Sequence, residues 1–439
     1  MLKKILIFIY SLVTILISSL LGLITFSLLT VYINEYLAVL CAVAIFSVLI
    51  FIADKFRLKM FSLDTHKKKY FRILSIGFFS LIMIYIFWIP TKTFESTNSV
   101  VTQYNISPEI IKTNSGEQIA VYKKEPKKSN GQAPILYVCG GPGAYPLETE
   151  KFLNRFSELG YTVYTFDPLG TRRSPLPKST SHYTITNEVK VVNDIVDHYN
   201  LKKVNLIASS YGGNVSTRFI EKHPEKVNAY MAIDTAPIYS MDYNYPEQAK
   251  ESRFIKSMDE PRIQPNKKHY PSFMTYTSWK QLTRIGYGLA LMEIFKMNDI
   301  PYGNYNEYDY FNSLIAGSSS GEIKKGGKST IHFNFMANRN ITASLDESVD
   351  FTKNLKKIDT PPVLVVQPEY GIVPWQLHYQ FKDYFDKTQF LAVSGAPHRT
   401  WVTQEGEDKL VKNGDALFHG EKVPDGYQSS ENPFPPLKK

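Results

Sequence analysis

The sequence predicts an α/β protein with a doubly wound, mostly parallel sheet and an inserted, mostly helical lid, preceded by three transmembrane helices. Three long uncharged runs occupy the first 90 residues. Short β-rich runs then alternate with helical patterns, as expected of a parallel sheet covered on both faces. A Tyr-rich interval interrupts this alternation before the strands resume. The expected divisions are a membrane anchor at 1–90, a first part of the core at 91–237, a lid insertion at 238–358, and a second part of the core with a polar C-terminal tail at 359–439.

The anchor is predicted from the length of its uncharged runs. Residues 5–33, 36–53 and 73–90 contain no charged side chain, and they are 29, 18 and 18 residues long. A helix needs roughly 17–25 apolar residues to cross the hydrocarbon core of a bilayer. The first run is too long for the apolar region of a cleaved signal peptide. We therefore expect a multi-pass membrane protein.

The basic residues of the anchor predict its orientation. Of the formal charge of +9, residues 1–90 carry +6, and the basic side chains precede the first span or crowd the loop between the second and third. Short segments rich in Lys and Arg resist translocation and stay in the cytoplasm. The chain after residue 90 is therefore expected on the extracytoplasmic side.

Composition excludes several classes of protein. With 44% hydrophobic and 21% charged residues, the chain is not largely disordered. Its two cysteines are too few for a disulfide framework or a Cys-based zinc site. Residues 91–439 carry only +3 and show no basic stripe, so no nucleic-acid partner is expected.

The core is predicted as eight strands with helices between them. Two short segments flank the turn signal Asn114-Ser115-Gly116 and predict a hairpin. The strands are expected at 109–113, 118–123, 134–138, 162–166, 204–208, 230–233, 363–366 and 390–393. Helical patterns are found at 150–159, 188–199 and 215–222, and at 279–296 within the insertion.

The segment 208–213 (ASSYGG) is the most informative part of the chain. It directly follows an apolar strand and directly precedes a helix. A strand that turns sharply into a helix strains its corner residue and requires small residues two positions before and after it, here Ala208 and Gly212. Ser210 occupies the corner, where its hydroxyl is exposed for nucleophilic attack beside a helix N-terminus.

A glycine-rich turn, Cys139 to Gly143 (CGGPG), follows the strand at 134–138. Without Cβ atoms, the backbone N–H groups of such a turn can approach a substrate carbonyl closely. We expect the N–H of Gly141 and the N–H of Tyr211, next to the nucleophile, to form the oxyanion hole.

Here the chain resembles a known family. The turn 139–143 is similar to the His-Gly-Gly-Pro-Gly motif of proline iminopeptidase-like α/β-hydrolases, with Cys139 in place of His. Residues 167–174 (DPLGTRRS) resemble that family's Asp-Gln-Arg-Gly-x-Gly-Arg-Ser motif, with Leu169 and Arg172 as departures, and Ser210 falls on its nucleophile elbow. The resemblance spans roughly 110–236 and 360–402. The family's Trp-and-Glu lid motif, which receives a free amine, is absent from the sequence.

His398 is the predicted general base. The resemblance implies the chain order Ser, acid, His, and His398 directly follows the strand at 390–393. Its imidazole can accept and return a proton near neutral pH. Four other histidines follow Ser210 but none directly follows a strand, and we expect ordinary surface or packed roles for them: His269, His332, His378 and His419.

Two carboxylates compete for the role of the acid. The family's usual Asp, after the strand at 363–366, is missing, and Glu369 is the nearest carboxylate there. Asp234 ends the strand after the elbow helix, 24 positions beyond Ser210. That position matches the acid of haloalkane dehalogenase-like and pancreatic lipase-like members, although an Asp there is also structural in other relatives. Asp234 is the preferred prediction and Glu369 the alternative.

The resemblance and these residues predict a membrane-anchored serine hydrolase that cleaves an amide or ester through an acyl-enzyme, without metal or organic cofactor. The first expectation is a proline iminopeptidase-like aminopeptidase acting on small peptides. An esterase or lipid acylhydrolase is the alternative, because the peptide lid motif is absent. A non-catalytic binding or sensing module is the alternative of another class.

Overall fold

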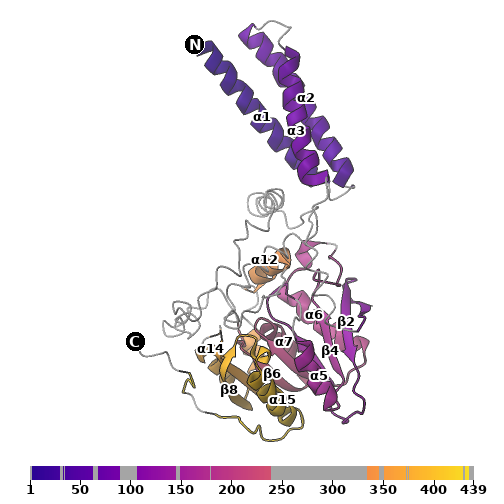
Figure 1. The fold of residues 1–439 in the computed structure, drawn as a ribbon, viewed down its shortest axis with the longest axis vertical. Helices are drawn as coiled ribbons and strands as arrows, with labels where there is room; N and C mark the ends of the chain where they lie inside the picture. The colour runs from indigo at the N-terminus through magenta and orange to yellow at the C-terminus, as the bar shows by residue number, and fades with distance from the viewer. Residues whose placement is uncertain are drawn as a thin grey trace. The chain divides into compact units, whose positions relative to one another are not determined.

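The structure is a computed structural model, and it describes most of the N-terminal helices and of the α/β body (Figure 1). The described residues are 2–29, 33, 35–62, 68–88, 106–144, 149–177, 179–238, 334–345, 351–371, 373, 375–428 and 431–434. They belong to two compact units, the N-terminal helices and the body that follows them. Most of the predicted lid, including the helix expected at 279–296, lies outside the described residues.

The N-terminal unit consists of three helices: α1 (Leu2–Leu29), α2 (Glu35–Phe61) and α3 (Lys68–Met83), the last extended by a π-helical turn (Ile84–Trp88). Each is long and apolar enough to cross a membrane, over Leu2–Leu29, Tyr36–Phe61 and Tyr70–Trp88. The helices contact one another through apolar side chains, and the rings of Phe46 and Phe79 stack with centroids 4.0 Å apart.

A buried acid links α2 and α3. Asp54 on α2 accepts from Arg57, one turn further along the helix, at 2.7 Å and from Arg72 on α3 at 2.5 Å. The Asp54 carboxylate is fully buried, so it needs these cationic partners to offset the cost of leaving water.

The body is built on one eight-stranded sheet in the order β1-β2-β4-β3-β5-β6-β7-β8. Its strands are β1 (Glu109–Lys112), β2 (Gln118–Lys124), β3 (Ile135–Val138), β4 (Val163–Asp167), β5 (Val204–Ser209), β6 (Val227–Ile233), β7 (Val363–Tyr370) and β8 (Thr388–Pro397). β1 and β2 pair antiparallel, β2 joins β4 antiparallel, and every other pair is parallel. The carboxyl ends of β3 to β8 therefore meet at one edge, where ligands bind in sheets of this kind.

Helices cover both faces of this sheet (Figure 1). α5 (Glu150–Glu158) and α15 (Gln404–Phe418) pack against each other, and α6 (Ile185–His198) packs against α7 (Gly212–Lys222). The remaining elements are α12 (Phe335–Ser344), α13 (Phe351–Leu355), α14 (Trp375–Tyr379) and the 3-10 turns Thr180–His182, Pro224–Lys226, Gln380–Asp383 and Thr400–Val402. Alternate residues of the central strands face opposite layers, and both sets are buried, which explains their continuous apolar runs.

The predicted fold class is confirmed, and every strand expected from the sequence is present. β6 begins three residues earlier than expected and β7 and β8 continue several residues further. The helix α15 lies in the segment that we expected to be core and polar tail. The helix is amphipathic: its sequence is rich in polar residues, but Leu410, Leu417 and Phe418 are buried in the hydrophobic core.

The packing of α5 generates a prediction. Phe156 is fully buried against Phe152, Tyr161 and Phe418, whereas Leu159 at the end of the same helix is 44% exposed. We expect Phe156→Ala to lower the free energy of unfolding by about 3–5 kcal/mol, because it removes a buried ring and leaves a cavity. Urea denaturation of the detergent-solubilised protein measures the change, and Leu159→Ala, which should have a much smaller effect, is the matched control.

Candidate active site

Ser210 stands at a strained corner between β5 and α7. β5 ends at Ser209, α7 begins at Gly212, and Ser210 has a φ of 51°. A non-glycine residue rarely adopts this left-handed conformation, so the surrounding contacts must hold it there. The Ser210 N–H donates to the Ile233 carbonyl of β6 at 3.0 Å, and the Thr235 hydroxyl donates to the Ser210 carbonyl.

Small residues around this corner are required by the neighbouring strand. A Cβ atom at Gly212 would lie 2.3 Å from the Val138 carbonyl oxygen, closer than any real contact. The sequence predicted a small residue at this position from the turn alone, and the structure shows that β3 is the element that excludes a larger one.

The glycine-rich turn after β3 lies directly against Ser210. A Cβ atom at Gly140 would be 2.7 Å from the Ser210 Cβ, and Gly141 has a φ of 103° that favours glycine. At the other end of the turn, the Asn338 side chain of α12 donates to the Pro142 carbonyl at 2.9 Å, and the Asn334 N–H donates to the Gly143 carbonyl at 2.7 Å. The structure therefore places the glycine-rich turn against Ser210 through Gly140, and the role of the Gly141 N–H stays a prediction.

The thiol that replaces the family's histidine is not a rival nucleophile. Cys139 is buried, and its Sγ donates to the Ala144 carbonyl at 3.4 Å. Burial, together with the nearby acids Glu188 and Asp167, raises the pKa of the Cys139 thiol well above its ordinary value. A protonated thiol is a poor nucleophile, so we do not expect Cys139 to act as one.

Asp234 and His398 form a contact at the carboxyl edge of the sheet. Asp234 follows β6 with a φ of 42°, and its Oδ2 accepts from His398 Nδ1 at 2.5 Å. The carboxylate is fully buried. Burial alone would raise its pKa, but the charge of His398 and hydrogen bonds from His378 and His398 outweigh that effect and lower the pKa of Asp234 to about 2. Asp234 is therefore ionised at neutral pH, and its contact with Nδ1 orients the His398 imidazole.

A second histidine, His378, reaches the same carboxylate. It lies on α14, is fully buried, and places its Nε2 3.2 Å from Asp234 Oδ1. Its Nδ1 contacts the side-chain oxygen of Gln367 at the end of β7. We expected an ordinary packed histidine here. It is packed as expected, but its contact with Asp234 was missed, because no spacing in the sequence links positions 234 and 378.

Glu369 has a different partner. Its Oε2 accepts from the Gly395 N–H at 2.8 Å, so it ties the end of β7 to the end of β8. Among the residues that the structure describes, no group of three or more His, Cys, Asp and Glu side chains is arranged to hold a metal ion.

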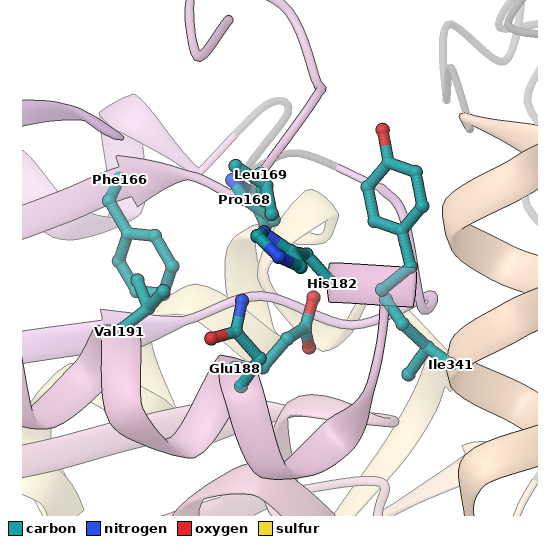
Figure 2. A pocket seen from close by; sticks show the side chains of 9 residues that line it. Phe166, Pro168, Leu169, His182, Glu188, Val191 and Ile341 are labelled. Carbon is teal, nitrogen blue, oxygen red and sulfur yellow. The ribbon is translucent and has the colours of Figure 1, made fainter. Parts of the chain in front are cut away.

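A small pocket lies beside the carboxyl end of β4. It is lined by residues of the loop after β4, the turn Thr180–His182, α6 and α12, and Figure 2 shows Glu188 below the His182 ring. Burial raises the pKa of Glu188 to about 7, an effect partly offset by its interaction with the Tyr211 hydroxyl. The tyrosine whose N–H was predicted to bind the oxyanion is thus next to a carboxyl group that titrates near neutrality.

The family model described as the alpha/beta hydrolase fold matches residues 133–400, well over half of the chain. The chain belongs to the alpha/beta hydrolase fold family. It is therefore a hydrolase, and a serine nucleophile is typical of the superfamily. The predicted family resemblance is confirmed.

Individual relatives are distant. A proline iminopeptidase of Lactobacillus delbrueckii subsp. lactis is 23% identical over 209 residues, which cover 43% of this chain and 71% of the relative. A proline iminopeptidase of Flavobacterium johnsoniae is 27% identical over 116 residues, covering 25% of this chain and 39% of the relative. Among solved structures, an esterase from Exiguobacterium antarcticum aligns with 71% of this chain and 99% of its own at 15% identity and a TM-score of 0.45.

The raised pKa of Glu188 predicts a pH-dependent stability. Its pKa rises from an ordinary 4.5 to about 7 on folding, so the folded chain binds more protons than the unfolded chain between these values. Stability contributed by the protonated form is complete below pH 4.5 and is lost as the pH rises through 7. We expect Glu188→Gln, which keeps a neutral polar group, to raise the melting temperature relative to wild type at pH 8, with no gain at pH 4.5.

Thermal melts of the detergent-solubilised protein across this pH range measure the effect. Glu158→Gln makes the same change of charge at an exposed side chain of α5, and it should shift the melting temperature equally at both pH values. A gain for Glu188→Gln that does not vary with pH would contradict the assignment.

Proposed function

We propose that the chain is a membrane-anchored serine hydrolase in which Ser210 attacks an ester or amide carbonyl. The observation that carries the proposal is the 2.5 Å contact between Asp234 and His398, at the same sheet edge as the strained Ser210. A strained serine alone would be compatible with a structural turn. A buried carboxylate that orients an imidazole beside that edge supplies the base that a serine needs for activation.

In this mechanism His398 Nε2 takes the proton of the Ser210 hydroxyl as its oxygen attacks the carbonyl carbon. Asp234 holds the required tautomer through Nδ1 and stabilises the imidazolium that forms. The N–H groups of Gly141 and Tyr211 donate to the oxyanion of the tetrahedral intermediate. Loss of one such donor typically costs about 3 kcal/mol of transition-state stabilisation.

The imidazolium then gives its proton to the leaving amine or alcohol, and the carbonyl reforms as an acyl-enzyme. A water molecule enters, His398 removes its proton, and a second tetrahedral intermediate collapses to release the acid and restore the Ser210 hydroxyl. The same residues thus serve both halves of the reaction.

For the substrate, we propose removal of the N-terminal residue of small peptides. The support is the resemblance of residues 139–143 and 167–174 to the proline iminopeptidase motifs, and the similarity to two curated proteins of that name. Hydrolysis of an ester or a lipid acyl chain is the second candidate, favoured by the absence of the family's Trp-and-Glu motif from the sequence.

The location is part of the proposal. Three helices long and apolar enough to span a bilayer precede the body, and the basic residues at 55, 57, 59, 67, 68, 69 and 72 favour a cytoplasmic loop between the second and third. This orientation would place the hydrolytic body outside the cytoplasm.

Variants of the candidate acid test the mechanism. We expect Asp234→Asn to lower kcat by roughly 10⁴-fold, because a neutral amide fixes the wrong imidazole tautomer. Glu369→Gln should keep most of the turnover, since Glu369 bonds to the Gly395 N–H instead. Labelling of the membrane fraction with a fluorophosphonate probe provides an independent measure, and Ser210→Ala must abolish it. The reverse order of the two acid variants would transfer the role to Glu369, and a wild type that is never labelled would favour a non-catalytic binding module.

A substrate panel tests the proposed specificity. Aminoacyl-naphthylamides with a free α-amine should be cleaved with a higher kcat/KM than N-acylated versions of the same compounds or nitrophenyl esters of varied chain length. A preference for long-chain nitrophenyl esters would instead assign the protein to the ester and lipid hydrolases.

A further inference from the structure

The environment of Asp234 contains more than a catalytic pair requires. Its carboxylate has two oxygens, and the structure provides a separate imidazole for each: His398 at Oδ2 and His378 at Oδ1, 2.5 Å and 3.2 Å away. The Val373 N–H also approaches Oδ1, at a longer 3.4 Å. Both His378 and Asp234 are fully removed from solvent.

We propose that His378 is a positioning residue of the catalytic site, which holds Asp234 in the rotamer that orients His398. This inference rests on the proposed function of Ser210, His398 and Asp234. It adds two side chains to that site, because Gln367 in turn contacts His378. Gln367, His378, Asp234 and His398 thus form one chain of contacts.

The Asp234 carboxylate could rotate about its terminal torsion if only one of its oxygens were held. The terminal torsion of an aspartate side chain is broad and has few steep minima of its own. A carboxylate held at one oxygen can swing about this torsion and tilt the partner imidazole. His398 at Oδ2 and His378 at Oδ1 together restrict this rotation. The correct imidazole orientation therefore depends on His378 as well as on Asp234.

Burial of the same carboxylate also has a cost. A buried carboxylate oxygen without a partner leaves a desolvated charge uncompensated, which is expensive in a protein interior. Gly371 passes so close that a Cβ atom there would lie 2.5 Å from Asp234 Oδ1. The site therefore packs tightly around Oδ1, and His378 brings a polar nitrogen to that oxygen.

The contact with Asp234 also depends on the proton of His378. A lone pair on Nε2 would repel the facing carboxylate, so Nε2 must carry the proton. Gln367 permits this for either orientation of its amide: its oxygen can accept from a protonated Nδ1, or its NH₂ group can donate to a bare Nδ1. Gln367 on β7 thus fixes the ring with its Nε2 3.2 Å from Asp234 Oδ1.

Two amide variants of His378 test the proposal, because they differ mainly in reach. The amide nitrogen of Gln can occupy the place of Nε2, whereas that of the shorter Asn corresponds to Nδ1 and falls short of Asp234. We expect His378→Asn to slow fluorophosphonate labelling of Ser210 by about 10- to 100-fold, the range found when residues that orient metal ligands are replaced. His378→Gln should recover most of that loss. Thermal melts of the full-length protein in detergent, recorded in parallel, show whether each variant is folded.

His419 provides a matched control. It is also an imidazole paired with a carboxylate, Asp415, and it contacts the Tyr161 hydroxyl. Tyr161 precedes β4, so this pair lies at the amino ends of the strands, at the opposite edge from the site. His419→Asn should leave the labelling rate unchanged.

A double mutant separates positioning from a general loss of packing. If His378 acts through Asp234, adding His378→Asn to Asp234→Asn should slow labelling far less than it does in the wild-type background, because the shared interaction is already lost. A merely structural histidine would give the same fold-change in both backgrounds.

The outcomes distinguish this inference from the function on which it rests. Absence of labelling in the wild type would overturn the proposed function. Labelling of the wild type, with equal rates for folded His378→Asn and wild type, or for His378→Asn and His378→Gln, would overturn the positioning role alone. Equal fold-changes in the two backgrounds would do the same.

Discussion

The buried charge of Asp234 is the constraint on which the rest of the site depends. A carboxylate without access to water is tolerated only where cationic or donor groups meet both of its oxygens. This requirement explains why three segments distant in sequence converge at the end of β6: the loop after β8 brings His398, α14 brings His378, and β7 leaves room with Gly371. Ser210 lies next to this cluster because its N–H pairs with the last residue of β6.

Features encoded by neighbouring residues could be predicted from the sequence. Strands were recognised by continuous apolar runs, the strand-to-helix corner by small residues around Ser210, and the turn after β3 by its glycines, since each depends on contacts within a few positions. The position of Asp234 was also predictable, because it ends the strand that follows the elbow helix, where the resemblance to haloalkane dehalogenase-like members places an acid. Its contact with His398 follows from parallel strands ending at one edge.

The partners His378 and Gln367 could not be predicted in the same way. Their contact depends on how α14 folds back over the end of β7, and no periodic pattern encodes that path. The sequence indicated only that an acid was missing after this strand. In the structure, Gln367 of that strand contacts His378 through its side-chain amide. Nothing in the sequence distinguishes this glutamine from an ordinary polar residue. The helix α15 was not predicted, because charged residues alternate in its sequence with the apolar residues of its buried face.

The start of α12 contacts the loops that follow β3 and β4. Its first turn holds the carbonyls of both Pro142 and Gly143, and Asn334 also donates to the Gly170 carbonyl in the loop after β4. Two loops that follow the neighbouring strands β3 and β4 are therefore held by the start of one helix, which couples the position of the glycine-rich turn beside Ser210 to that of the loop after β4.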